Sequence, residues 1–145
     1  MKEIKGSIDI EAPPDRVWGV LTDFSSYPRW NPWITKMWGE LKVGNTYDAV
    51  VTPPGKGAMK LRSTVVRIDN GKQLLFKGKA MGGLVNDEHL FVLESAGPEM
   101  TRFHQSVIFK GILIPLLGGT IRAQQNGLQA MNVALKKICE KREIR

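Results

Sequence analysis

The feature that most constrains this fold is a long amphipathic helix, which the sequence predicts for its last third. Its apolar residues form two neighbouring rows: one in which the residues recur seven apart, Ile121, Leu128 and Leu135, and a second with Leu117, Met131 and Ile138. A helix of about 25 residues would be about 38 Å long and would carry one continuous apolar stripe. Such a stripe must be buried against a surface of matching size. The rest of the chain therefore has to supply a large apolar surface.

The segment from 36 to 110 predicts that surface, because it consists of alternating runs joined by tight turns. Asp69-Asn70-Gly71 separates two long runs, and Ala96-Gly97-Pro98 separates two more, as is typical of antiparallel hairpins. Residues 1–11 alternate as a further strand. The predicted fold class is α+β: a curved antiparallel β-sheet of about seven strands wrapped around a long C-terminal helix, with two short helices after strand 1. A sheet gripping a helix in this way is expected to leave a space between them.

Bulk composition excludes several classes of protein. The length of 145 residues suits a single domain spanning 1–145. The one cysteine, Cys139, is expected to be a small buried residue and cannot form an internal disulfide. We expect no export signal, and no apolar run is long enough to cross a bilayer. The sequence therefore predicts a cytoplasmic protein without integral membrane association.

Positive charge is the compositional feature that suggests a partner. The chain has 21 Lys and Arg residues against 14 Asp and Glu residues, a net charge of +7, which can attract nucleic acid or an anionic membrane. The basic residues are spread through the predicted strands, and recognition of RNA by stacking would need exposed aromatics among them. We expect no nucleic-acid partner. An interaction module that binds an anionic membrane, a ribosome or a chaperone stays open as an alternative.

Aromatic residues are concentrated in one early segment. All four tryptophans lie between positions 18 and 38, and "YPRWNPW" occupies 27–33. Its two prolines predict a turn between the first helix and the sheet. We expect Trp30 to pack inside this corner and Trp33 to lie at the rim of a cavity.

The order of these motifs resembles the START-like superfamily, also called SRPBCC or Bet v 1-like. "IDIEAPPDRVWGVLTDFSSYPRWNPW" is similar to the opening of its polyketide cyclase/dehydrase and lipid-transport-like branch, and "GKQLLFKG", "EHLFVLE" and "LQAMNVALKK" follow in the same order. The resemblance covers nearly the whole chain. It implies a helix-grip fold whose cavity, between the sheet and the C-terminal helix, binds an apolar or amphipathic small molecule such as a lipid, polyketide, quinone or sterol-like compound. Some members are enzymes, so a polyketide cyclase/dehydrase-type enzyme using the same pocket is the alternative.

One position departs from the pattern of that branch. Its penultimate strand often carries an inward glutamate, where this chain has Val107 in "FHQSVIFKG". An inward acid that could transfer protons is missing at this position. The departure favours an apolar pocket and a binding role over catalysis.

His89 is the only candidate for a catalytic residue. Strand alternation places Asp87, His89, Phe91 and Leu93 on one face, with the apolar members indicating the core side. His89 could act as a general base oriented by Asp87, or it could simply orient a ligand by hydrogen bonding. His104 is expected to face outward on its strand. The histidines and the cysteine lack metal-site spacing, so we predict no metal and no cofactor.

The candidate ligand-binding cavity has three predicted walls: the "YPRWNPW" corner, the strands and the long helix. Apolar walls with a few polar groups are typical of small-molecule sites. Core and cavity walls have the same composition, so these residues could instead fill the core completely. The candidates are Trp33, Leu61, Phe76, His89, Phe91, Gln105, Val107, Met131 and Leu135.

The connection "GILIPLLGGT", residues 111–120, carries apolar residues between glycines. It could be a flexible portal or the contact of a homodimer. Alternatively, the long helix could begin at Leu113–Pro115 and bury these residues.

Overall fold

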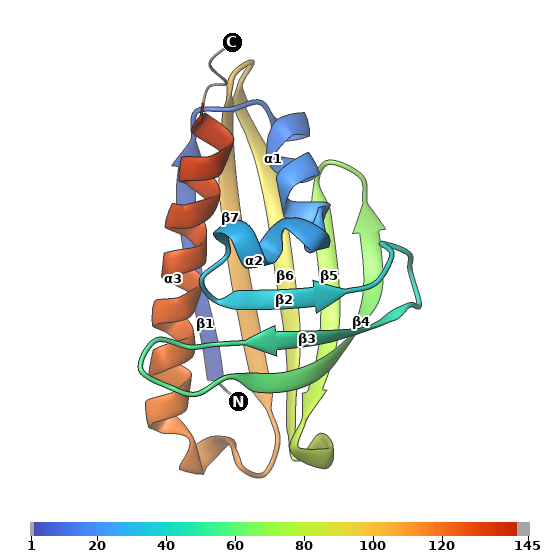
Figure 1. Ribbon diagram of the computed structural model, residues 1–145, viewed down its shortest axis with the longest axis vertical. Coiled ribbons are helices and arrows are strands. Elements are labelled where there is room, and N and C mark those ends of the chain that lie inside the picture. The colour runs from blue at the N-terminus through green and yellow to red at the C-terminus, as the bar shows by residue number, and fades with distance from the viewer. Residues whose placement is uncertain (1, 142–145) are drawn as a thin grey trace.

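The computed structural model describes residues 2–141 and shows an antiparallel sheet curled around a long helix (Figure 1). The strands follow the spatial order β1-β7-β6-β5-β4-β3-β2. They are β1 (Lys2–Ile10), β2 (Ile34–Trp38), β3 (Thr46–Val51), β4 (Met59–Asp69), β5 (Gln73–Ala80), β6 (Val85–Gly97) and β7 (Met100–Lys110). The helices are α1 (Pro14–Thr22), α2 (Tyr27–Trp30) and α3 (Gly118–Glu140), and the 3-10 turns are η1 (Phe24–Ser26), η2 (Met81–Gly83) and η3 (Ile114–Leu116). The predicted fold class is confirmed.

The long helix α3 lies along β1, at one side of the curled sheet (Figure 1). Leu128, Met131 and Leu135, from the two predicted apolar rows, are buried. The helix begins at Gly118, so the alternative start at Leu113–Pro115 is wrong. Only Leu117 separates η3 from α3. No helix among the described residues is both long and apolar enough to span a bilayer.

Strand alternation places the predicted side chains on the predicted faces. On β7, Phe103, Gln105 and Val107 are buried on the inner face, and His104 lies on the outer face, where it pairs with Glu94. Bulges interrupt the pairing in β2 and β4. A bulge bends a strand and increases its twist, which accounts for the strong curl of β2 to β4 over the inner face.

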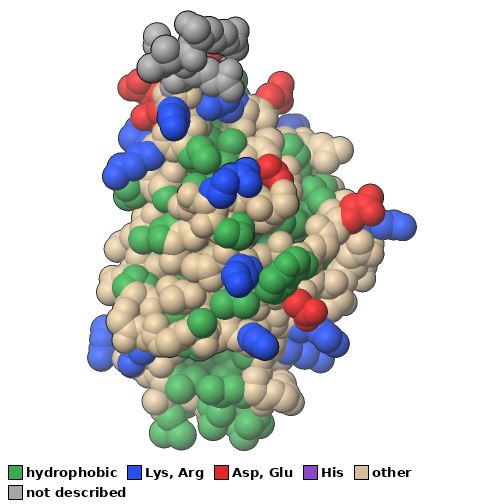
Figure 2. Space-filling view, in the orientation of Figure 1, with side chains coloured by type: hydrophobic (Ala, Val, Ile, Leu, Met, Phe, Trp, Pro, Cys, Tyr) green, Lys and Arg blue, Asp and Glu red, His purple; other side chains and the backbone are tan. Residues whose placement is uncertain are grey.

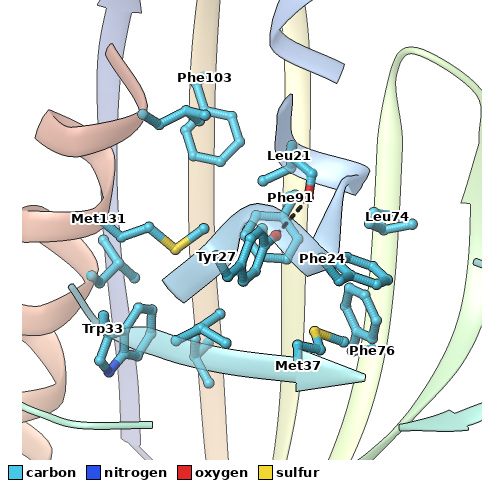
Figure 3. Packing of buried hydrophobic residues seen from close by; sticks show 14 of the residues in the cluster. Leu21, Phe24, Tyr27, Trp33, Met37, Leu74, Phe76, Phe91, Phe103 and Met131 are labelled. Carbon is cyan, nitrogen blue, oxygen red and sulfur yellow. Dashed lines mark hydrogen bonds between the residues drawn. The ribbon is translucent and has the colours of Figure 1, made fainter. Parts of the chain in front are cut away.

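The "YPRWNPW" corner is held by hydrogen bonds between its own side chains and the neighbouring backbone. The hydroxyl of buried Tyr27 donates to the carbonyl of Leu21 (Figure 3). The indole of Trp30 donates to Ser26 Oγ at 2.9 Å and packs edge-on against Tyr27, as predicted for this corner. Asn31 Oδ1 then accepts from the backbone N–H groups of the two residues that lead into β2. The motif is therefore mainly a structural element that aims β2 across the sheet.

Candidate functional site

A small cavity of about 40 Å³ lies on the inner side of the curled sheet. Its apolar wall comes from α2 and strands β2 to β6, and includes Tyr27, Met37, Leu61, Phe76 and Phe91, most of which are visible in Figure 3. One water molecule needs about 10–15 Å³ in this measure. The small cavity therefore holds a few waters, whereas drug-sized ligands occupy pockets of about 300–1,000 Å³.

Four of the nine predicted cavity residues line this space: Leu61, Phe76, His89 and Phe91. The remaining five are buried but do not line it: Trp33, Gln105, Val107, Met131 and Leu135. No residue of α3 contributes to the wall. The small cavity is thus displaced from the predicted position under the C-terminal helix toward α2, β2 and β3.

Trp33 explains this displacement, because its ring fills the space between β2 and α3. The indole lies directly on Gly127, where a Cβ atom would be 2.7 Å from Trp33 Cγ. The indole Nε1 also donates to Gln124 Oε1 at 2.6 Å. The predicted place of Trp33 at a cavity rim is therefore wrong for the small cavity. Figure 3 shows Trp33 beside α3, below Met131.

A chain of buried hydrogen bonds connects β6, β7 and α3. Nε2 of His89 lies 2.6 Å from Gln105 Oε1, and Gln105 Nε2 donates to Asn132 Oδ1 at 2.8 Å. Because an amide oxygen can only accept, His89 donates from Nε2. Gly6 on β1 makes room for this chain, since a Cβ there would approach the Asn132 amide to 3.3 Å.

His89 is uncharged at neutral pH in this environment. Burial lowers its pKa from 6.5 to about 4, although the hydrogen bond that it donates to Gln105 opposes the shift. The ring also stacks on Phe91 with centroids 4.4 Å apart. The hydrogen-bond partner of His89 is Gln105, which fixes the ring, and not Asp87, as the general-base alternative required.

An inward carboxylate is nevertheless present, on β6 rather than on β7. Ser63, Gly78 and Asp87 form one row across β4, β5 and β6. A Cβ on Gly78 would lie 2.8 Å from both carboxylate oxygens, so the glycine makes room for Asp87. Burial raises the pKa of Asp87 from 3.8 to about 6, and the backbone N–H of Gly78 partly offsets this. We call Ser63, Asp87 and His89, which all line the cavity, the polar corner.

Asp87 was not among the predicted cavity residues, although alternation had placed it on the inner face. The available signal was its position two residues before His89. Tyr27 and Met37 were also missed, because α2 and β2 are too short to show a clear periodicity. The inward direction of Tyr27 and Met37 depends on the hydrogen bonds that hold the "YPRWNPW" segment.

A groove of about 620 Å³ adjoins the cavity, and Ala49 and Leu61 line both spaces. Trp38 and η2 form other parts of its wall. In η2 the backbone of Met81 has a φ of 54°, and both following glycines also have positive φ. Ala49 and Leu61 are therefore the residues at which the cavity and this groove come closest together.

A family model described as "Polyketide cyclase / dehydrase and lipid transport" matches residues 1–140. Two curated proteins from Mycobacterium tuberculosis strains, both named as toxins, are 26% identical over 88 residues. The match covers 58% of this chain and 60% of each relative, so it spans less than two thirds of their length.

Solved structures with the same fold include a START superfamily protein from Mycobacterium smegmatis, with a TM-score of 0.77 at 18% identity, covering 95% of this chain and 97% of that one. A hypothetical protein from Helicobacter pylori gives a TM-score of 0.80 at 14% identity, with coverage of 95% and 88%. A Thalictrum norcoclaurine synthase variant in complex with a transition-state analogue gives 0.67 at 18% identity, with coverage of 95% and 93%. At these identities the likeness is one of fold.

Proposed function

Because the chain belongs to the polyketide cyclase / dehydrase and lipid transport family, we propose that it binds an apolar or amphipathic small molecule on the inner side of its curled sheet. The observation that carries the proposal is the polar corner in an otherwise apolar cavity, next to a groove of about 620 Å³. Small-molecule sites combine apolar walls with a few polar groups that orient the ligand. A lipid, polyketide, quinone or sterol-like compound has the corresponding character.

The size of the small cavity implies that ligand binding moves side chains. Leu61 is half-buried and lines both the groove and the cavity, so its displacement would join the two spaces. Met37 is unbranched and adapts readily to a new neighbour. In the joined space, the apolar body of the ligand would occupy the groove and its polar group would reach Asp87. An ionised carboxylate only accepts hydrogen bonds, so a hydroxyl or another donor fits this position.

Closing the passage at Leu61 provides the test. We expect Leu61→Trp to weaken ligand binding about tenfold or more, because a bulky indole would occupy the space that the ligand needs and tenfold corresponds to only about 1.4 kcal/mol. Val66→Trp is the matched control, since Val66 is an exposed residue of the same strand outside the cavity wall. Native mass spectrometry and displacement of an apolar dye, with a panel of lipids, polyketides, quinones and sterols, would measure the effect. If no panel member binds the unmodified protein and none co-purifies with it, the proposal fails.

An enzyme of the cyclase/dehydrase type is the second candidate, and Asp87 is the observation that favours it. A carboxyl group with a pKa near 6 is closer to neutrality than an ordinary aspartate, which suits general acid–base catalysis. With its pKa near 4, His89 is a weaker base than a free histidine. An enzyme would lose turnover in Asp87→Asn while still binding its substrate, and retained turnover would remove Asp87 from any catalytic role.

A further inference from the structure

An exposed apolar surface covers one end of the molecule. Met81 and Leu84, in the β5–β6 connection, are 57% and 42% exposed, and Ile112 and Leu116, in the β7–α3 connection, are 76% and 79% exposed. The two connections touch, because a Cβ on Gly111 would overlap the carbonyl of Leu84. Figure 1 places both connections at the lower end, and Figure 2 shows hydrophobic side chains gathered there. We call these four side chains the apolar tip.

The exposure of the apolar tip is not required by the fold. Ile114 alone anchors η3 in the core, with 2% exposure, and backbone hydrogen bonds from Ile114 to Gly111 and from Leu116 to Leu113 hold the turn. The side chains of Ile112 and Leu116 add nothing to this anchor. Contiguous exposed apolar surface of this kind marks a site of interaction with another molecule or a membrane.

The charge around the apolar tip is positive. Lys79 and Lys110 are exposed at the strand ends that lead into the two connections. Lys60 and Arg62 line the groove together with Met81. The sequence contains no Asp or Glu from 70 to 86 or from 100 to 139. Figure 2 shows Lys and Arg side chains on both sides above the apolar end.

The acidic residues near these cations are already engaged. Glu88 lies 3.3 Å from Lys110 and 4.0 Å from Lys77, and Asp48 lies 3.4 Å from Arg62. Glu3, on the outer face of β1, and Asp87, on the inner face of β6, are further acids at this end of the sheet. The cations outnumber the acids, so the border of the apolar tip attracts anions.

We propose that the apolar tip docks on an anionic phospholipid bilayer. The four apolar side chains would enter the boundary between headgroups and acyl chains, and the bordering lysines would contact anionic headgroups. Charge complementarity selects this partner over a second copy of the chain, because two copies meeting at this end would bring their lysines together. The inference does not rest on the proposed ligand, although Met81 belongs to both the apolar tip and the groove.

Vesicle flotation with the full chain tests the proposal. We expect binding to phosphatidylcholine vesicles that contain about 30% phosphatidylglycerol, and about tenfold weaker binding to phosphatidylcholine alone. The double variant Ile112→Ser, Leu116→Ser should bind the anionic vesicles about tenfold or more weakly than the unmodified protein, because it loses most of the inserted apolar area. Val43→Ser with Val133→Ser is the matched control, since both residues are exposed valines outside the apolar tip.

The charge contribution is tested by Lys60→Gln with Lys79→Gln. This variant should bind the anionic vesicles more weakly and with less dependence on salt, without losing affinity for phosphatidylcholine. Unchanged melting temperatures would show that each variant is folded. The proposal is overturned if the unmodified protein binds neither kind of vesicle, or if the apolar tip variant binds as well as the control. A lipid-free dimer that the tip variant abolishes, without vesicle binding, would assign the surface to a second copy instead.

Discussion

Replacing Gly127 by alanine is expected to destabilise the protein by about 2 kcal/mol, although alanine favours a helix over glycine by about 1 kcal/mol. The added Cβ would lie 2.7 Å from both Cγ and Nε1 of Trp33. The ring cannot move away freely, because it is buried and its Nε1 is bonded to Gln124 on the same helix. Forcing extra volume into a packed site typically costs about 1–3 kcal/mol, and loss of the indole hydrogen bond would add to that.

Gly19→Ala is the matched control for this substitution. Gly19 lies inside α1, is exposed, and a Cβ there would meet nothing within 4 Å. It should therefore gain up to about 1 kcal/mol from helix propensity. Urea denaturation of both variants at neutral pH measures the difference. In a Trp33→Ala background, Gly127→Ala should lose its penalty, because the two substitutions share one contact. If Gly127→Ala is as stable as Gly19→Ala, the close contact between Trp33 and α3 does not exist in solution.

Gly127 also shows where prediction from the sequence stops. The apolar rows predicted α3, and a glycine inside that helix indicated a close neighbour. The identity of the neighbour could not be predicted, because Trp33 is 94 positions away and lies in a turn whose backbone is held by hydrogen bonds to Asn31. The same physical limit applies to the cavity, because the wall of an apolar cavity and a packed core have the same amino-acid composition. The sequence therefore could not show whether the space around Met131 is filled or empty.

The inner faces of β6 and β7 were predictable, whereas the bonds across them were not. Alternation placed Asp87, His89 and Gln105 inward. Whether His89 would bond Asp87 or Gln105 depends on the register of the two strands, which pairs His89 with Val107. A bulge between Ser95 and Gly97 shifts that register near the turn. A shift of one residue would move the whole inward set to the other face, so the partner of His89 required the structure.

Asp87 and His89 are expected to change the free energy of unfolding in opposite directions as the pH is lowered. The pKa of His89 falls from 6.5 to about 4 on folding, so below pH 6.5 the unfolded chain takes up a proton that the folded chain does not. The effect of His89 therefore lowers the free energy of unfolding as the pH falls from 6.5 toward 4. The pKa of Asp87 rises from 3.8 to about 6, so its contribution increases as the pH falls from 6 toward 4. Each effect amounts to at most about 3 kcal/mol at 1.36 kcal/mol per unit of pKa, and the two nearly cancel.

Single substitutions should reveal the two opposing effects of pH on the free energy of unfolding. Asp87→Asn removes a buried charge and is expected to raise the free energy of unfolding at pH 7 by up to about 3 kcal/mol. That gain should shrink as the pH is lowered from 6 to 4, because Asp87 of the unmodified protein then takes up a proton and loses its charge. The stability of the variant itself should fall over the same interval, because only the effect of His89 is left. His89→Gln keeps a donor for Gln105, and its stability should instead increase over the same interval. His104→Gln, on the outer face, is the control for replacing a histidine elsewhere in the same sheet. Urea titrations at several pH values between 4 and 7.5 measure all four proteins. Parallel curves for Asp87→Asn and His89→Gln would mean that these groups do not titrate as buried residues, and that the polar corner is open to water.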